Sequence, residues 1–340
     1  MLTIDGSWGE GGGQILRTSL ALSLVTGTPF RIHHIRAARA KPGLRAQHLA
    51  ALEAAAAVGE ADVEGAAVGA REIVFRPRRV RAGTYRFDLG TAGSTGLVLQ
   101  TILLPLVVAR APSSLTLEGG THNTHAPPFD FLAQAFLPLV KRMGAGVEAR
   151  LERPGFYPAG GGRVRVDITE GHPLSPLSLV QRGATRRRWA RAMVSRLPRQ
   201  IADRELAVIR SRLGWQAAEL EAVVLSENTA GPGNVLLLGI ESEHVTEVFT
   251  GFGEIGVRAE TVAERAAGEA RSYLSADVPV GPYLADQLLL PLALAGGGAF
   301  RTMPLSLHAT TNFDVIRRFL DVSIAVTRVN EAAVDVTVQR

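Results

Sequence analysis

Three segments of the chain share one pattern of apolar and polar positions. Each begins with small residues that predict a turn, continues as a nearly unbroken apolar run of helical length, and then breaks; the three lie at 11–27, 93–110 and 281–297. A run without a polar face predicts a helix that is covered on all sides. We therefore expect three buried helices at equivalent positions of a repeated unit.

Similar elements follow each of these helices. A short strand and a polar or basic loop lead to amphipathic helices, which we expect at 45–58, 129–143 and 313–320. Segments of alternating pattern then predict strands, among them 72–75, 163–168, 322–326 and 334–338. The unit is therefore of the βαβαβ type, and the fold class is α/β, or α+β.

The spacing of the repeats indicates an inserted domain. The first two apolar helices begin about 82 residues apart and the second and third about 188 apart, an excess of roughly 100 residues. Composition changes in the same region, because residues 182–204 contain eight arginines and one acid. We predict large-domain repeats 1 and 2 at 1–181, a small α+β domain at 182–276, and the third repeat at 277–340.

Composition excludes several classes of protein. The chain has 340 residues, of which 46% are hydrophobic and 20% charged, as in globular proteins. It has no cysteine, which excludes disulfides, iron–sulfur clusters and thiol catalysis. The apolar stretch 97–109 is too short to span a bilayer. The first residues lack a basic and then apolar leader, so we expect a cytoplasmic protein without membrane partners.

The positive charge of the chain is made almost entirely of arginine. The formal net charge is +5, and only Lys41 and Lys141 among the 37 basic residues are lysines. Arginine suits bidentate recognition of phosphate. Neither lysine has the neighbours of a P-loop or of a lysine-dependent nucleotidyl transferase. Any ATP chemistry must therefore use another phosphate-binding element and a nucleophile other than lysine.

A glycine-rich turn opens the first apolar helix. It reads Gly9-Glu10-Gly11-Gly12-Gly13-Gln14 and suits an anion, because glycine backbone and a helix N-terminus present amides to it. Glu10 could hold a divalent cation beside phosphates. Arg17, one turn further on, needs an anionic partner if it is buried. The alternative for the turn is that its glycines only allow a tight change of chain direction. The alternative for Arg17 is that its side chain reaches solvent at the helix end.

A second basic segment lies between the next strand and helix. Arg36, Arg39 and Lys41 precede Arg45, and Gln47 and His48 follow on the first turn of the helix at 45–58. Such a loop suits a polyanion such as a nucleic-acid backbone. The alternative is a solvated basic loop.

His308 is the candidate nucleophile. Residues 310–312 offer an N-cap, which would place His308 just before a helix N-terminus, where the dipole favours a neutral ring. A structural histidine near a cap is the alternative. His122 and His125 have H-x-x-H spacing, but without cysteine or a nearby third ligand they do not predict a metal site. The other histidines, His33, His34, His172 and His244, are interpreted as structural or solvated.

The third copy of the turn-to-helix element carries polar side chains. Tyr283 offers a stacking face for a base, and Asp286 and Gln287 offer polar edges. A plain helix start is the alternative. Gln100, within the second apolar helix, must find hydrogen bonds, either from the backbone or from a ligand.

Eight blocks of the chain, in order, resemble the RNA 3′-terminal phosphate cyclase family. They are GEGGGQILR (9–17), RAxRAKPGLRxQH (36–48), the 93–100 helix start, APP…F (126–131), FYPAGGG (156–162), GPGN (231–234), YLADQL (283–288) and H…TN (308–312). The resemblance implies three initiation-factor-like or enolpyruvyl-transferase-like βαβαββ repeats and an inserted thioredoxin-like domain.

The resemblance also implies an activity and its residues. Family members use ATP and a divalent cation, Mg²⁺ or Mn²⁺, to convert an RNA 3′-phosphate end into a 2′,3′-cyclic phosphodiester through a histidyl-AMP, which would form on His308. Glu10 would bind the metal. The nucleotide would contact Gln100, Pro127, Phe131, Tyr283, Leu284, Ala285, Asp286 and Gln287. The RNA end and its phosphates would contact Arg17, Arg36, Arg39, Gln47 and His48.

Two alternatives follow from the same resemblance. One relative lacks the histidine and serves ribosome assembly as a scaffold without catalysis; His308 argues against this reading. A remoter relative transfers enolpyruvyl groups and would need lysines that this chain lacks. The oligomeric state, a homodimer included, is left open by the sequence.

Overall fold

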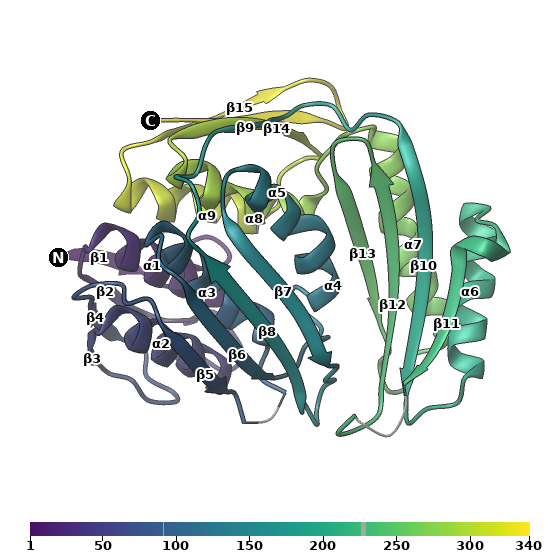
Figure 1. The fold of residues 1–340 in the computed structure, drawn as a ribbon, viewed down its shortest axis with the longest axis horizontal. Coiled ribbons are helices and arrows are strands. Elements are labelled where there is room, and N and C mark those ends of the chain that lie inside the picture. Colours follow the sequence, from purple (N-terminus) through teal and green to yellow (C-terminus); the bar gives the residue numbers. More distant parts are fainter. Residues whose placement is uncertain (91, 226–228) are drawn as a thin grey trace.

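The computed structural model describes residues 1–90, 92–225 and 229–340. Within these residues the strands form four sheets of four strands each. Figure 1 shows the helices of the large domain gathered between three of the sheets, with the fourth sheet and its helices α6 and α7 to one side. The prediction of an α/β fold built from repeated units is confirmed.

The first two repeats follow one another along the chain. Repeat 1 consists of β1 (Leu2–Asp5), α1 (Gly13–Thr26), β2 (Phe30–His33), α2 (Ala46–Gly59), β3 (Asp62–Glu64) and β4 (Ile73–Arg76). Repeat 2 consists of β5 (Thr84–Asp88), α3 (Thr95–Val108), β6 (Ser113–Gly119), α4 (Phe129–Phe131), a π-helical turn (Leu132–Phe136), α5 (Leu137–Arg142), β7 (Gly146–Arg153) and β8 (Gly162–Thr169). The helix predicted at 129–143 thus contains a π-helical turn.

The third repeat is split by the inserted domain. It consists of β9 (Leu177–Leu179) and then α8 (Pro282–Leu294), β14 (Gly297–Thr302), α9 (Leu307–Phe319), β15 (Ser323–Arg328) and β16 (Val334–Gln339). The sequence analysis assigned this repeat to residues 277–340 alone. Its first strand lies instead before the insertion, because β9 pairs in parallel with β14. Three residues are too few to show a strand pattern in the sequence.

All three repeats have the same sheet topology. The orders are β1-β2-β4-β3, β5-β6-β8-β7 and β9-β14-β16-β15, so in each sheet the fourth strand lies between the second and the third. The first two strands are parallel and the other pairs antiparallel. A parallel pair needs a crossover, which the buried helices α1 and α3 supply in repeats 1 and 2. In repeat 3 the crossover contains the inserted domain and α8.

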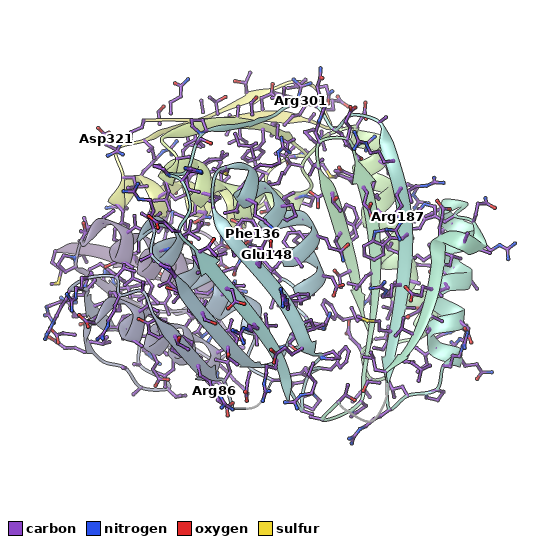
Figure 2. All side chains as sticks on the ribbon, viewed as in Figure 1. Arg86, Phe136, Glu148, Arg187, Arg301 and Asp321 are labelled. Atoms are coloured by element: carbon purple, nitrogen blue, oxygen red, sulfur yellow. The ribbon has the colours of Figure 1, made fainter. Side chains whose placement is uncertain are left out.

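The predicted apolar helices form the centre of the large domain. Helix α1 contacts α2, α3 and α9, and buries Ile15, Leu16 and Leu20. Phe136, labelled in Figure 2, belongs to the same core. Because these helices are covered by sheets and by one another, their sequences need no polar face.

The inserted domain has a sheet and a core of its own. It consists of β10 (Thr185–Ser195), α6 (Gln200–Leu213), a 3₁₀ turn (Ala217–Glu219), β11 (Leu220–Leu225), β12 (Gly233–Ser242), β13 (Thr246–Phe252) and α7 (Ala259–Ala276), with sheet order β11-β10-β12-β13. Trp215, Phe249 and Tyr273 fill its core. Many of its arginines pair with acids, as Arg187 (Figure 2) does with Glu241.

Two element boundaries differ from the sequence prediction in ways that affect function. The short strand that follows the first apolar helix, which the sequence predicts at 30–35, is β2 and ends at His33, because His34 adopts a left-handed φ of 52°. Helix α9 begins at Leu307, six residues before the predicted start at 313, because the Ser306 side chain accepts from the Ala309 N–H and caps it. None of the described helices combines the length and the apolar character that a membrane crossing requires.

Candidate functional site

The glycine-rich loop between β1 and α1 packs against the beginning of α9. Gly9 has a φ of 56°, and a Cβ on it would lie 2.1 Å from Oγ1 of Thr311, so no larger side chain fits there. The same Oγ1 accepts a hydrogen bond from the Glu10 N–H at 3.0 Å. The loop therefore places Glu10 beside the first turns of α9, which carry His308.

His308 lies within the first turn of α9 and not before the helix, as the sequence analysis expected. The N-cap is Ser306 rather than one of residues 310–312. The His308 side chain is 56% exposed, so a ligand can reach it. Its Nδ1 lies 2.7 Å from Oε1 of Gln14, near the N-terminus of α1. Two helix N-termini thus meet at this imidazole.

Hydrogen bonds determine the tautomer of His308. Oδ1 of Asp286, in α8, accepts from Nε2 of Gln14 at 2.5 Å and from Nδ2 of Asn312 at 3.2 Å. The amide nitrogen of Gln14 is thereby committed to Asp286, and its oxygen faces His308. Nδ1 of His308 must then carry a proton and donate it. The remaining ring nitrogen, Nε2, has a free lone pair and can act as a nucleophile.

Glu10 lies in the same site and is almost fully buried, with 4% of its side chain exposed. Its Oε2 accepts from Nη2 of Arg39 at 2.5 Å and lies 3.9 Å from Nδ1 of His308. Its Oε1 is buried and has no hydrogen-bond partner among the described residues. An unpartnered carboxylate oxygen beside a candidate phosphate site fits a hard divalent cation. Glu10 therefore fits the metal-binding role that the resemblance implies.

Arg17 and His48 converge on the start of α1. A Cβ on Gly13 would lie 2.4 Å from Nε2 of His48 and 2.7 Å from Nη1 of Arg17, so both groups approach the helix backbone where glycine leaves room. Burial lowers the pKa of Arg17 to about 10, against the attraction of Glu10 and Asp286. The Arg17 guanidinium makes no ion pair with any described residue, which leaves it available to an anion.

His48 has a different role from the one its position in a basic loop suggests. It is 3% exposed, and its Nδ1 accepts from the Arg45 N–H at 3.1 Å, which helps to cap α2. Burial, with the charges of Arg17, Arg36 and Arg45, lowers the pKa of His48 to about 3. The ring is therefore neutral, and Nε2 carries a hydrogen that faces Gly13.

The other residues of the basic segment divide into two groups. Arg36 donates to the carbonyl oxygens of Lys41 at 2.6 Å and Gly43 at 3.1 Å, so it closes the loop on itself. Arg39 reaches across to Glu10 and is part of the site. Gln47 is exposed on the first turn of α2. Only Arg39 of these three contacts the Glu10–His308 cluster directly.

The residues of α8 that were predicted to contact the nucleotide differ in their exposure to solvent. Tyr283 is 56% exposed and donates to Oε1 of Glu269 at 3.2 Å. Leu284 and Ala285 are buried, so their side chains belong to the core and only their backbone can contact a ligand. Gln287 is half-buried in α8. Asp286 belongs to the hydrogen-bond chain that holds His308.

The second-repeat residues lie on neighbouring elements. Phe131 of α4 is 3% exposed, and Pro127 packs beside Gly96 at the start of α3. Gln100 is half-buried in α3. Helix α8 contacts the π-helical turn that continues α4. This contact places the second-repeat residues on the side of the third repeat.

The two histidines of the second repeat lie in different surroundings. His122 is buried, with Nε2 2.9 Å from Oδ2 of Asp130 and Nδ1 2.8 Å from Oγ1 of Thr121. His125 is exposed and has a left-handed φ of 59°. Both ring nitrogens of His122 are thus satisfied by protein.

Gln14 and Asn312 are site residues that the sequence analysis did not select. Gln14 was noted only as the end of the glycine-rich motif, and Asn312 only as a possible cap. Gln14 is a polar residue at the start of an otherwise apolar helix, which is the signal that could have identified it. Its two partners come from α8 and α9, far along the chain.

Fold and site together define an α/β protein built of three repeats, with an exposed histidine beside Glu10 and Gln14. The model of the RNA 3′-terminal phosphate cyclase family matches residues 8–326. Cyclases of that name from Koribacter versatilis and Ectopseudomonas mendocina are 49% and 50% identical to the chain. These alignments cover 98% and 97% of the chain and 94% and 96% of the relatives. The chain belongs to the RNA 3′-terminal phosphate cyclase family.

A solved enolpyruvyl transferase, NikO from Streptomyces tendae, matches with a TM-score of 0.30 and 17% identity. That match covers 51% of this chain and 33% of the transferase.

Proposed function

We propose that the chain converts the 3′-phosphate end of an RNA into a 2′,3′-cyclic phosphodiester at the expense of ATP, through an adenylate carried by His308. The observation that carries this proposal is the hydrogen-bond chain from Asp286 through Gln14 to Nδ1 of His308. In the neutral ring it leaves the lone pair on Nε2, and the side chain is exposed to ligands. Membership of the cyclase family supports the overall reaction.

In the first step Nε2 of His308 attacks the α-phosphorus of ATP. A P–N bond forms, the bond to the β-phosphate oxygen breaks, and pyrophosphate leaves. The ring becomes positively charged, and its Nδ1–H stays bonded to Gln14 at 2.7 Å. The carboxylate of Glu10, with Oε2 3.9 Å from Nδ1, stabilises that charge.

In the second step an oxygen of the RNA 3′-phosphate attacks the phosphorus on His308, which frees the histidine and forms an RNA-adenylate. The neighbouring 2′-OH then attacks the activated 3′-phosphorus, loses its proton and expels AMP. This closure is favoured because the hydroxyl is held on the same ribose, which gives it a high effective concentration.

The remaining residues of the site are suited to phosphate and metal. Arg17 is free of protein ion pairs among the described residues, and His48 presents an Nε2–H beside it. We assign both to phosphate groups of the substrates. Glu10 would hold Mg²⁺ or Mn²⁺, which when bound neutralises triphosphate charge. Exposed Tyr283 and half-buried Gln287 are assigned to the nucleoside of ATP, with Gln100 and Pro127.

The test is labelling with ATP that carries radioactive α-phosphate. Wild-type protein should acquire an acid-labile label, and His308→Ala should not. His244→Ala, which removes an exposed histidine of the inserted domain, is the matched control and should label normally. Retention of label by His308→Ala would show that the nucleophile is another residue.

An RNA-binding assembly protein without turnover is the competing function. It predicts binding of RNA but no labelled protein and no release of AMP. The same experiment with a 3′-phosphorylated oligonucleotide separates the two, because a cyclase converts the labelled protein back to free enzyme and releases labelled AMP.

A further inference from the structure

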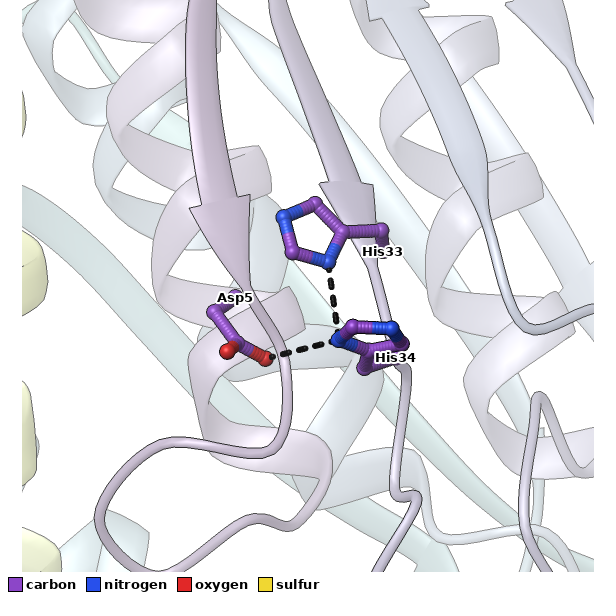
Figure 3. Close-up of side chains that lie close together, drawn as sticks. All are labelled: Asp5, His33 and His34. Carbon is purple, nitrogen blue, oxygen red and sulfur yellow. Dashed lines mark hydrogen bonds and ion pairs between the residues drawn. The ribbon is translucent and has the colours of Figure 1, made fainter.

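Three potential metal ligands lie together outside the site described above. Asp5 ends β1, and His33 and His34 follow each other at the end of β2 (Figure 3). The parallel pairing of β1 and β2 places Asp5 opposite His33. Their carboxylate and ring nitrogen atoms all lie within 4.8 Å of one another.

The backbone at His34 is what brings the two rings together. Successive side chains of a strand point to opposite faces, so two adjacent histidines normally cannot meet. His34 has a φ of 52°, in the left-handed region that residues with a Cβ rarely adopt. As a result Nδ1 of His33 and Nδ1 of His34 lie only 3.0 Å apart. Nδ1 of His34 lies 3.6 Å from Oδ1 of Asp5.

These separations match the spacing of ligands around one small cation. Zinc–nitrogen and zinc–oxygen bonds are about 2.1 Å long, so two ligands at a tetrahedral angle lie about 3.4 Å apart. The measured 3.0 and 3.6 Å lie on either side of that value. The carboxylate of Asp5 is held in place by Ser7, whose N–H and hydroxyl both donate to Oδ1, so Oδ2, which has no hydrogen bond to a described residue, is the oxygen left for a cation. Such outer-shell bonds orient metal ligands in proteins.

We propose that Asp5, His33 and His34 form a binding site for a first-row transition dication such as Zn²⁺. Two imidazoles and one carboxylate favour zinc, cobalt or nickel over Mg²⁺, which prefers oxygen ligands. The site is therefore chemically distinct from the Glu10 position. Asp5 and His34 are about half exposed or more, which leaves room for water as a further ligand.

The position of this site gives it a structural consequence. Asp5 leads into the glycine-rich loop that carries Glu10, and His34 leads into the loop that carries Arg39. The two loops already meet where Gly6 N–H donates to the carbonyl oxygen of His33 at 2.8 Å. A bound ion would tie the two loops together at their base. It would thus stabilise the geometry in which Arg39 reaches Glu10.

The test is a titration of tag-free, full-length protein with Co²⁺, followed by its visible absorption. Wild-type protein should bind one Co²⁺ per chain at this site, with excess Mg²⁺ present, and Zn²⁺ should displace it. His34→Gly suits the left-handed backbone, so it should fold while weakening Co²⁺ binding by about tenfold or more. His33→Ala should have the same effect.

Two variants serve as controls. His244→Ala removes an exposed histidine of the inserted domain, and His308→Ala removes the histidine beside Glu10; both should keep the Co²⁺ absorption. Thermal unfolding gives a second readout, since Zn²⁺ should raise the Tm of wild-type protein but not of His34→Gly. Equal Co²⁺ affinity in wild-type, His33→Ala and His34→Gly proteins would overturn the proposal, as would loss of the absorption in His308→Ala alone.

Discussion

Glu247 of β13 accepts a hydrogen bond from the N–H of Gly281, the residue that precedes α8, at 2.5 Å. One residue belongs to the inserted domain and the other to the start of the helix that carries Tyr283 and Asp286. The carboxyl group is buried, and burial raises the pKa of Glu247 to about 8. This contact joins the inserted domain to the candidate active site.

The raised pKa makes stability depend on pH. The native protein keeps a proton on Glu247 that the unfolded chain loses above its ordinary pKa of 4.5, so this group destabilises the fold increasingly as pH rises from about 4.5 to 8. Glu247→Gln keeps an acceptor for Gly281 without the charge. We expect it to gain stability relative to wild type by about 1–3 kcal/mol between pH 5 and 8. Denaturant unfolding at both pH values measures this, with exposed Glu53→Gln as a control that should show no such trend.

Gln14 should control the reactivity of His308. In Gln14→Ala the Nδ1 of His308 loses its acceptor, so the tautomer with a free Nε2 is no longer favoured. We expect the rate of adenylate formation to fall about 100-fold, together with a lower Tm because Asp286 loses a hydrogen-bond donor. Single-turnover labelling measures the rate. Exposed Gln181→Ala is the matched control, and a Gln14→Ala rate equal to that of the control would refute the tautomer argument.

Arg17 should show opposite effects on stability and binding. Desolvation of Arg17 is only partly offset by the attraction of Glu10 and Asp286, and no ion pair to a described residue completes it, so Arg17→Met removes a partly compensated cation. We expect an equal or higher Tm together with at least about tenfold weaker binding of 3′-phosphorylated RNA. Fluorescence anisotropy and thermal unfolding test both parts. The exposed residue in Arg210→Met provides the control; a drop in Tm for Arg17→Met without loss of RNA affinity would assign Arg17 to structure alone.

The cap of α9 should matter for activity as well as stability. Ser306→Ala removes the side-chain acceptor of the Ala309 N–H and should cost about 1 kcal/mol. Because His308 lies in the turn that this cap fixes, adenylate formation should fall as well. Ser306→Thr restores an acceptor and should recover both quantities. An activity loss that Thr fails to rescue would mean that the hydroxyl acts on the substrate instead.

The arginines of β10 should not bind RNA, although the sequence there is the most basic of the chain. Arg187 pairs with Glu241 at 3.3 Å and Arg191 with Glu221 at 2.8 Å, so their charge is balanced locally. The double variant Arg187→Ala, Arg191→Ala should leave RNA affinity and its salt dependence unchanged. A reduced salt slope in anisotropy titrations would show that this face does bind the phosphate backbone.

The sequence was sufficient for features that depend on local pattern. The apolar runs at 11–27, 93–110 and 281–297 became α1, α3 and α8, since complete burial leaves a signature in composition alone. The shared pattern of these helices also predicted the repeated unit, and their unequal spacing predicted the inserted domain. Short β9 was missed, because three residues carry no periodicity and its partner strand lies beyond the inserted domain.

The sequence predicted which residues belong to the site but not the contacts between them. Glu10 and His308 were selected from motifs and do lie together, with Oε2 and Nδ1 3.9 Å apart. The role of Gln14 depends on which of its amide atoms faces Asp286, a relationship between helices that no local pattern contains. His48 was selected for its place on the first turn after a basic loop and through the family resemblance, and the structure buries it and keeps it neutral. Burial of this kind is decided by tertiary packing.

The division of the third repeat also constrains how the protein can be made. On the ribosome Leu177 and Leu179 of β9 emerge well before β14, with which they pair at Gly298 and Phe300. Until the C-terminal segment is translated, these apolar side chains have no sheet to join. The nascent chain must therefore complete a large independent module first and close its last sheet at the end of synthesis.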